Sequence, residues 1–416
     1  MTRLLIFASA LHDASSVMGS RKELLDSLVA AFDCETVYVD STDSVIEPFN
    51  GRTLCFIATG GTEELFRSHI DAVPAPVTLI ADGLHNSLAA SLEIRTYLAR
   101  RCVSCRILSA EEAVAEGGNT ASADAGAGAV PCPSEPVPAA FGQDISDWDL
   151  AEFEGMFIGL AGGESPWLIS SGIDRRAVEE KYRMQFRDVP LDFVREKYEA
   201  TSDDDPDVAA ALLSLRARLA DDRTLDDLTR AARMYVALRD ICRDSGFDAL
   251  TVKCFDLLDS CGTTACLALA LLNDEDIVCG CEGDIPALWT MIYTKRYMGR
   301  PAFMCNPASL CREDLSLELA HCTLPLSMTT AFSLPSHFES GIGIGIRGTM
   351  PEGRYALLKI SGDRLQYLYR AEGEIVANTC VPQRCRTQVR FRFDSATDFD
   401  RFLFTAKGNH VVLVRL

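Results

Sequence analysis

The residues best suited to chemistry are a carboxylate and two histidines that each stand beside a predicted β-strand. Glu282 directly follows the strand-like segment 277–281, and His321 follows the strand-like segment 315–320. His410 comes just before another apolar, strand-like segment. The chain has only six histidines, and a carboxylate with two imidazoles is a ligand set for a divalent metal ion. We therefore expect Glu282, His321 and His410 to come together in a metal site.

The composition limits the class of protein. A chain of 416 residues is too long for one ordinary hydrophobic core, so we expect two or three domains. Nearly half of the residues are apolar (48%), and apolar segments alternate with amphipathic ones, as is typical of an α/β protein. A formal net charge of -20 offers no basic face to a phosphate backbone, so we expect no nucleic-acid partner.

The lengths of the apolar segments indicate in which cellular compartment the protein is expected. None approaches the ~20 consecutive residues that cross a bilayer, so we expect no membrane partner. The short apolar stretch 1–7 is soon followed by His12 and Asp13, which favours a buried first strand over a signal peptide. We therefore expect a cytoplasmic protein whose 16 cysteines are free thiols. Cys102 and Cys105 have the spacing of a redox motif, but no second pair accompanies them to bind zinc.

Strands and helices alternate through the first part of the chain. Strand-like segments such as 53–58 and 77–81 are each followed by a helical segment, such as 87–100 after the second. This alternation predicts a parallel sheet with helices on both faces, and ligands of such sheets bind at the carboxyl ends of strands. A second unit of the same kind begins near Met156 and places Glu282 at the end of its last strand.

The residue composition and the apolar pattern change at two places along the sequence. Residues 113–150 are rich in Gly, Ala and Pro without a periodic apolar pattern, which predicts a flexible linker. After Arg300, short alternating strands separated by turns indicate an antiparallel sheet or barrel. We therefore predict domains over 1–112, 151–300 and 301–416, with the linker between the first two.

The turn from Thr59 to Glu63 follows the strand-like segment 53–58. Its backbone amides could cradle an anion or sugar hydroxyls. It lacks the glycine spacing of a dinucleotide fingerprint and the lysine of a P-loop, so a nucleotide site is not expected. The alternative is a tight turn without a ligand.

Several short blocks, in order along the chain, resemble a known family. They are Ala58-Thr59-Gly60-Gly61-Thr62-Glu63, Gly159-Leu160-Ala161-Gly162-Gly163 with Trp167-Leu168-Ile169, Cys281-Glu282-Gly283-Asp284, Phe303-Met304-Cys305-Asn306-Pro307, Ala320-His321-Cys322, Ser336-His337-Phe338-Glu339-Ser340-Gly341, Cys385-Arg386-Thr387-Gln388 and Gly408-Asn409-His410. The chain resembles the L-fucose/L-arabinose isomerase superfamily, specifically its shorter, fucose isomerase-like bacterial and archaeal members. The resemblance covers nearly the whole chain outside the predicted linker.

The resemblance implies an α/β fold with two Rossmann-like parallel-sheet domains followed by a mainly antiparallel β domain. It implies a divalent metal ion, most often Mn²⁺, held by Glu282, by a carboxylate within 303–307, by His410 and, in the arabinose branch, by His321. The activity that it implies is the interconversion of an aldose and its ketose through an enediol, with the carboxylates moving the proton between C1 and C2. The implied substrate is a monosaccharide, a pentose or a 6-deoxyhexose. The implied assembly is a homo-oligomer, a trimer or hexamer, in which the first domain closes a neighbour's pocket.

The sequence departs from the family at Asn306, where a carboxylate is expected. An amide is neither a base nor an anionic ligand, although its oxygen can bind a metal weakly. Two functions stay open: an isomerase in which Glu282 is the base and Asp284 assists, or a carbohydrate-binding or regulatory homologue that has lost catalysis.

The remaining candidates are assigned to the substrate, with a structural role as the alternative for each. They are Thr59, Gly60, Gly61, Thr62, Glu63, His337, Glu339, Arg386 and Asn409. His337 and Glu339 belong to a polar turn that contacts substrate or is only structural. Arg386 binds substrate or forms a salt bridge. Cys281, Cys305 and Cys322 flank the ligand positions and are interpreted as packing residues.

Overall fold

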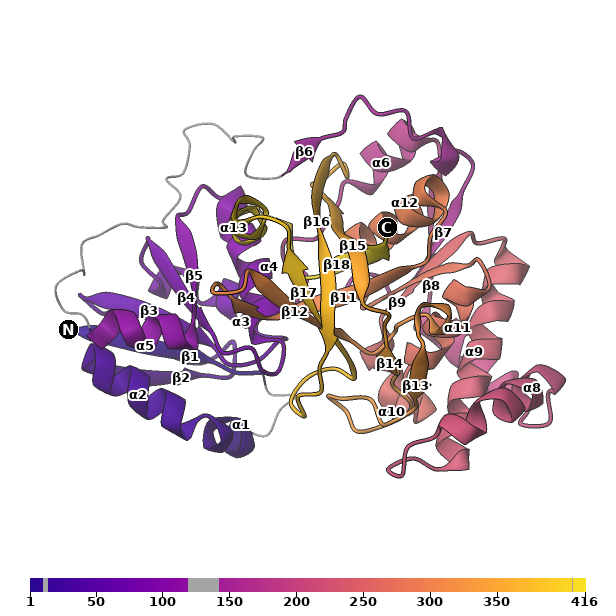
Figure 1. The fold of residues 1–416 in the computed structure, drawn as a ribbon, viewed down its shortest axis with the longest axis horizontal. Helices are drawn as coiled ribbons and strands as arrows, with labels where there is room; N and C mark the ends of the chain where they lie inside the picture. Colours follow the sequence, from indigo (N-terminus) through magenta and orange to yellow (C-terminus); the bar gives the residue numbers. More distant parts are fainter. Residues whose placement is uncertain (10–13, 119–141, 406) are drawn as a thin grey trace.

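The computed structural model describes residues 1–9, 14–118, 142–405 and 407–416. Residues 119–141 of the predicted linker therefore lie outside the described residues. Figure 1 shows two parallel sheets, one at each side of the molecule, with a large antiparallel sheet between them. The predicted mixture of parallel α/β sheets with an antiparallel C-terminal sheet is confirmed.

The first parallel sheet has the strand order β2-β1-β3-β4-β5. Its strands are β1 (Thr2–Phe7), β2 (Cys34–Val39), β3 (Arg52–Ile57), β4 (Val77–Ala81) and β5 (Cys105–Ser109), and its helices are α1 (Ala14–Ser20), α2 (Lys22–Phe32), α3 (Glu63–Ser68), α4 (Ser87–Arg100) and α5 (Ala110–Gly118). β3 and β4 are almost entirely buried, because helices cover both faces of the sheet. The order reverses between β1 and β3, so a ligand crevice is expected at their carboxyl ends.

The second parallel sheet repeats this order as β8-β7-β9-β10. Its strands are β7 (Phe157–Ala161), β8 (Gln185–Val189), β9 (Ala249–Val252) and β10 (Val278–Cys281), and its helices are α6 (Arg175–Tyr182), α7 (Leu191–Ala200), α8 (Pro206–Leu215), α9 (Leu225–Ser245), α10 (Leu258–Cys261), α11 (Cys266–Asp274) and α12 (Ile285–Met298). α9 begins with a capping box between Thr224 and Asp227 and ends at Gly246 in the left-handed conformation. Among the described residues no single helix could span a bilayer; only the bent pair 254–261 and 266–274 passes that test together.

The antiparallel sheet has the order β15-β18-β11-β12-β17-β16-β6 and closes on itself, because β15 also pairs with β16. Its strands are β6 (Gln143–Asp144), β11 (Ala302–Cys311), β12 (Ser316–His321), β15 (Gly353–Ser361), β16 (Tyr367–Asn378), β17 (Thr387–Phe393) and β18 (Val411–Arg415); β13 (Ala331–Ser333) and β14 (Arg347–Thr349) form a separate pair, and α13 (Ala396–Phe404) precedes β18. Closure leaves few free strand edges. The barrel expected as one alternative is therefore the one observed.

Three parts of the barrel region differ from the short alternating strands that the sequence predicts after Arg300. The segment 341–348 is mostly irregular rather than a strand, because Gly341 and Gly343 adopt positive φ values of 66° and 63°. The segments 364–369 and 372–379 belong mainly to one long strand, β16. α13 was not predicted at all, although Ser395 caps it through the Asp398 backbone N–H.

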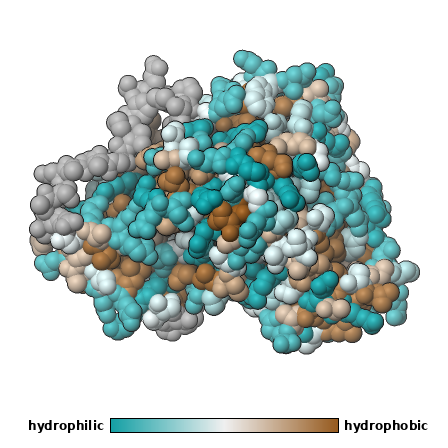
Figure 2. All heavy atoms as spheres, viewed as in Figure 1, coloured by the Kyte–Doolittle hydropathy of each residue, from teal (hydrophilic) through white to brown (hydrophobic). Residues whose placement is uncertain are grey.

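The cysteines that the structure describes are free thiols, and most are buried, as expected. On the surface, apolar side chains gather at the lower right of Figure 2, over the region where Figure 1 places α8. That helix carries Leu213, which is 69% exposed.

Candidate functional site

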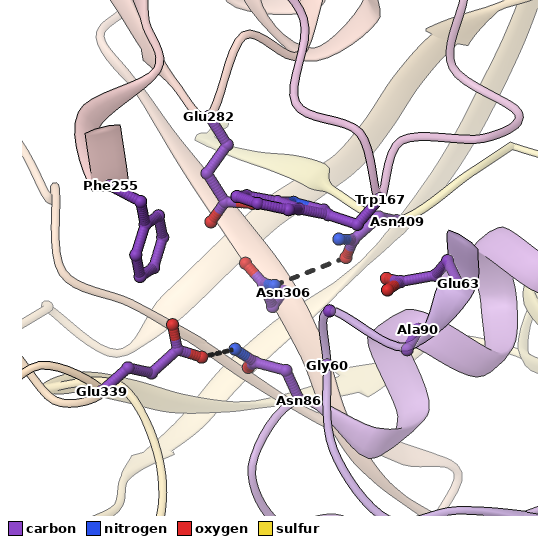
Figure 3. A pocket seen from close by; sticks show the side chains of 11 residues that line it. Gly60, Glu63, Asn86, Ala90, Trp167, Phe255, Glu282, Asn306, Glu339 and Asn409 are labelled. Atoms are coloured by element: carbon purple, nitrogen blue, oxygen red, sulfur yellow. Dashed lines mark hydrogen bonds between the residues drawn. The ribbon is translucent and has the colours of Figure 1, made fainter. Parts of the chain in front are cut away.

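A cavity lies where the three sheets meet, and each contributes side chains to it (Figure 3). It encloses about 410 Å³ of empty space, part of it open to solvent. The lining residues are Gly60, Gly61, Glu63, Asn86 and Ala90 from the first unit, Trp167, Phe255 and Glu282 from the second, and Asn306, Glu339 and Asn409 from the third. Most of the lining side chains are polar or acidic.

Glu282 enters this cavity from the end of β10. It adopts a positive φ of 60°, a strained backbone conformation for a residue with a side chain. Residues in such conformations are concentrated at functional sites. Gly283 follows with a φ of 71°, and a Cβ there would lie 2.2 Å from the carbonyl oxygen of Gly163. Only glycine fits this close approach. The tight turn therefore fixes where the Glu282 backbone leaves the strand.

The two carboxylate oxygens of Glu282 face different partners. Its Oε2 accepts a hydrogen bond of 2.9 Å from Nε1 of Trp167. Its Oε1 lies 3.6 Å from Nε2 of His410 and 3.8 Å from Nε2 of His321. Burial opposes ionisation, but the two histidines hold the pKa of Glu282 well below its usual range. Glu282, His321 and His410, which the sequence predicted to converge, do lie together.

His410 is oriented by a buried carboxylate on its other side. Its Nδ1 lies 2.9 Å from Oδ2 of Asp284, which also accepts from Lys359 Nζ at 3.1 Å and, through Oδ1, from the Ala287 backbone N–H at 2.7 Å. Asp284 caps the N-terminus of α12 and does not line the cavity. Burial raises the pKa of Asp284, but Lys359 and His410 outweigh burial and lower it to about 2. Burial opposes protonation of His410, but the Glu282 and Asp284 carboxylates outweigh burial and raise its pKa to about 9. In the neutral form of His410, the Nδ1–H donated to Asp284 leaves the Nε2 lone pair for a cation.

His321 is held in the same way by a hydroxyl group. Its Nδ1 lies 2.8 Å from Oγ1 of Thr323, so its Nε2 is the nitrogen that faces Glu282. Ligand atoms of Cys281, Glu282 and His321 lie within 4.8 Å of one another. The neighbouring Cys254 thiol, together with burial, raises the pKa of Cys281 well above its ordinary value, so Cys281 stays a neutral thiol. Cys281 is therefore a weaker candidate ligand than the histidines.

The donor set fits a divalent cation. Nε2 of His410 and Oδ1 of Asn306 are buried without a hydrogen-bond partner in the described part of the chain. Buried polar atoms without partners are costly, and a cation bound at either atom would offset that cost. Together with the Glu282 carboxylate they offer the oxygen and imidazole ligands that Mn²⁺ accepts.

The turn after β3 lies partly in the cavity. Gly60, Gly61 and Glu63 line it, and Oε2 of Glu63 is buried without a partner. Burial raises the pKa of Glu63 well above its ordinary value. Thr59 and Thr62 support the turn instead, since Thr59 accepts from the Ser9 backbone N–H and Thr62 donates to the Thr59 carbonyl.

The other four candidates, Glu339, His337, Arg386 and Asn409, also divide into residues that line the cavity and residues that do not. Glu339 lines the cavity and accepts a hydrogen bond of 2.6 Å from the Asn86 amide. His337 packs against the Phe255 ring behind the cavity wall, and burial lowers the pKa of His337 to about 4. Arg386 donates to the Ser336 carbonyl and hydroxyl and does not line the cavity. Asn409 lines it and accepts from Asn306 at 3.4 Å.

Sequence reasoning missed several lining residues. Asn86, Trp167 and Phe255 all follow the carboxyl ends of parallel strands, namely β4, β7 and β9. The rule that singled out Glu282, applied to every strand end, would have found them. Ala90 gives no signal in the sequence, since a small residue on an apolar helix is ordinary.

Glu339 should make the stability of the protein depend on pH. Burial and the Glu282 charge raise the pKa of Glu339 from 4.5 to about 8. The folded chain therefore keeps a proton that the unfolded chain releases, so the free energy of unfolding should fall as pH rises through this window, by up to about 1.4 kcal/mol per pH unit. We expect Glu339→Gln to remove this part of the slope in urea unfolding with EDTA present. A slope equal to that of the exposed control Glu313→Gln would contradict the assignment.

Comparison with known proteins adds two similarities. No protein-family model matches the chain. A sulfoquinovose isomerase of Clostridium sp. (strain MSTE9) is 31% identical over 115 residues, which are 27% of this chain and 24% of that protein. A sulfoquinovose isomerase of Alkalicoccus urumqiensis is 26% identical over 248 residues, 55% of each chain. The chain thus spans about a quarter of the first relative's length and about half of the second's.

Proposed function

We propose that this protein is an aldose-ketose isomerase that works through an enediol, with Glu282 as its base. The observation that carries the proposal is the setting of Glu282, whose Oε1 faces two imidazole nitrogens while its Oε2 is held by Trp167. Similarity to two sulfoquinovose isomerases supports the same reaction class. The resemblance to fucose isomerase-like proteins points the same way.

The residues that would hold a divalent cation, which we take to be Mn²⁺, are Glu282, Asn306, His321 and His410. When bound, such a cation polarises the carbonyl and adjacent hydroxyl oxygens of the sugar and makes the carbon-bound proton more acidic. Asn306 in place of a carboxylate leaves the ligand set with one negative charge fewer. We therefore expect weaker cation binding than a second carboxylate would give.

The chain's own groups divide the proton transfers between them. Glu282, through Oε2, takes the proton from C2 of the aldose and delivers it to C1 of the resulting enediol, which gives the ketose. Asn306 has no proton to exchange, and Asp284 is held by Lys359 away from the cavity. Glu339 lines the cavity and has a pKa raised to about 8. It is the group that we assign to move the hydroxyl proton.

The lining favours an uncharged sugar. The described lining residues include Glu63, Glu282 and Glu339 but neither Lys nor Arg. A sulfonate group would meet no lysine or arginine among these lining residues, whereas hydroxyl groups find amides and carboxyls. Trp167 and Phe255 add aromatic surface beside them. We therefore propose a pentose or a 6-deoxyhexose as substrate.

The test is isotope exchange. The protein is incubated with Mn²⁺ in D₂O and with pentoses, 6-deoxyhexoses or sulfoquinovose, and deuterium at C2 is followed by NMR. Exchange with an uncharged sugar supports the full proposal, and exchange with sulfoquinovose alone contradicts the substrate assignment. The second candidate function, a carbohydrate-binding protein without catalysis, is favoured by Asn306. Binding without exchange would establish it and overturn the isomerase.

The finer features of the fold and assembly are also proposals. The strand orders of both parallel sheets support Rossmann-like units over 1–112 and 151–300, with a fucose isomerase-like third domain over 301–416. We propose a cytoplasmic homo-oligomer, a trimer or hexamer, which sedimentation velocity can check.

A further inference from the structure

Helix α4 packs between the first parallel sheet and the barrel (Figure 1). Every residue from Ser87 to Leu98 is buried, including the charged Glu93 and Arg95. A buried carboxylate destabilises a fold unless several donors satisfy it. The partners of Glu93 therefore show what this helix holds in place.

Among the described residues, the hydrogen bonds to the Glu93 carboxylate all come from outside the first unit. Its Oε1 accepts from the Ser170 backbone N–H at 2.6 Å, and its Oε2 accepts from the Asn409 backbone N–H at 2.9 Å. The Ser171 hydroxyl lies 3.1 Å from Oε2. Glu93 thus joins the segment after β7 to the segment before β18, and it is itself fully buried.

Each of these segments carries a side chain that contacts Glu282. The first, 165–171, carries Trp167, whose Nε1 donates to Oε2 of Glu282. The second carries His410, whose Nε2 faces Oε1 of Glu282. The Glu93 carboxylate therefore holds both of the segments whose side chains contact the proposed base, Glu282.

A second residue of α4 holds the same segment. The Gly408 backbone N–H donates to Oγ1 of Thr96 at 3.0 Å. Gly408 has a φ of 82°, and a Cβ there would lie 2.9 Å from both Oε2 of Glu93 and the Ser171 hydroxyl. The glycine lets the backbone approach α4 closely enough for both hydrogen bonds.

We propose that Glu93 is a positioning residue that aligns Trp167 and His410 on Glu282, with Thr96 as its helper on the His410 side. This inference rests on the proposed function, because it assigns Glu93 a role in the reaction that Glu282 would catalyse. The first unit thereby contributes to the site in two ways. Some of its residues line the cavity, and the Glu93 and Thr96 side chains accept hydrogen bonds from backbone N–H groups of the other units.

The experiment compares four variants of the full chain. Glu93→Gln replaces one acceptor oxygen by an NH₂ group, so at least one segment loses its hydrogen bond. Thr96→Val removes the hydroxyl, and Thr96→Ser retains it. Ser91→Ala is the matched control, since the buried Ser91 hydroxyl donates to the Ser87 carbonyl of the same helix. Amide hydrogen exchange of peptides covering 165–171 and 404–410 is measured with kcat and KM.

We expect Glu93→Gln to speed exchange in at least one of the two segments and to lower kcat by about 10- to 100-fold, with a smaller change in KM. Thr96→Val should loosen only 404–410, while Thr96→Ser and Ser91→Ala should match the wild type. Unchanged exchange in both segments of Glu93→Gln, or unchanged kcat despite faster exchange, would overturn the positioning role. A wild type without isomerase activity would overturn the proposed function, and the exchange data would still decide whether Glu93 holds the two segments.

Discussion

The Glu282→Gln variant should fold normally and lose aldose-ketose exchange by about 10²- to 10⁴-fold, the usual contribution of a positioned general base. Glutamine keeps the shape of the side chain but cannot take a proton from carbon. Its NH₂ group would also face either the Trp167 N–H or the two histidine nitrogens that now surround the carboxylate. The variant should therefore bind Mn²⁺ more weakly as well. Turnover is measured by NMR, and cation affinity by calorimetry.

The matched control is Glu313→Gln, which removes the same charge from an exposed position in the turn between β11 and β12. It should keep full turnover and cation affinity. Thermal unfolding of both variants separates loss of catalysis from loss of fold. Turnover by Glu282→Gln equal to that of the control would remove Glu282 from the role of base.

The sequence predicted the type of each sheet because local patterns determine it. Strand-helix alternation requires parallel strands, and short alternating strands joined by turns favour antiparallel pairing. The closing of the barrel depends on β18, which lies between β15 and β11 although it is last in the chain. No local pattern encodes such a long-range pairing. The positive φ values that break 341–348 were likewise hidden by its alternating apolar residues.

The part of the site that the sequence predicted consists of residues beside strand ends, among them two histidines. The convergence of Glu282 with His321 and His410 followed from their places beside strands, and the structure brings them together. The role of Asp284 as a helix cap could also be predicted from the sequence. An Asp followed by Ile285-Pro286 is a helix-start signal, in which the Asp carboxylate accepts from backbone N–H groups. Glu93 lies in the middle of a helix. Only the tertiary structure shows what its carboxylate holds.

Lys359 was also readable in principle, since it interrupts the apolar strand β15. Its ammonium and the Asp284 carboxylate are both fully buried and lie 3.1 Å apart. Replacing Lys359 by Met removes one partner and leaves a buried carboxylate short of compensation. We expect this variant to lose about 3–5 kcal/mol of unfolding free energy, the usual cost of breaking a buried pair. Urea unfolding of the metal-free protein measures the loss.

The double variant with Lys359→Met and Asp284→Asn separates the charge from the packing. Asparagine keeps one acceptor oxygen, so it retains either the hydrogen bond from the Ala287 N–H or the one from Nδ1–H of His410, but not both. Because no unpaired charge is left, the double variant should recover part of the stability that Lys359→Met loses. A double variant less stable than Lys359→Met would show that Asp284 stabilises the fold through its hydrogen bonds to α12 and His410, not through its ion pair with Lys359.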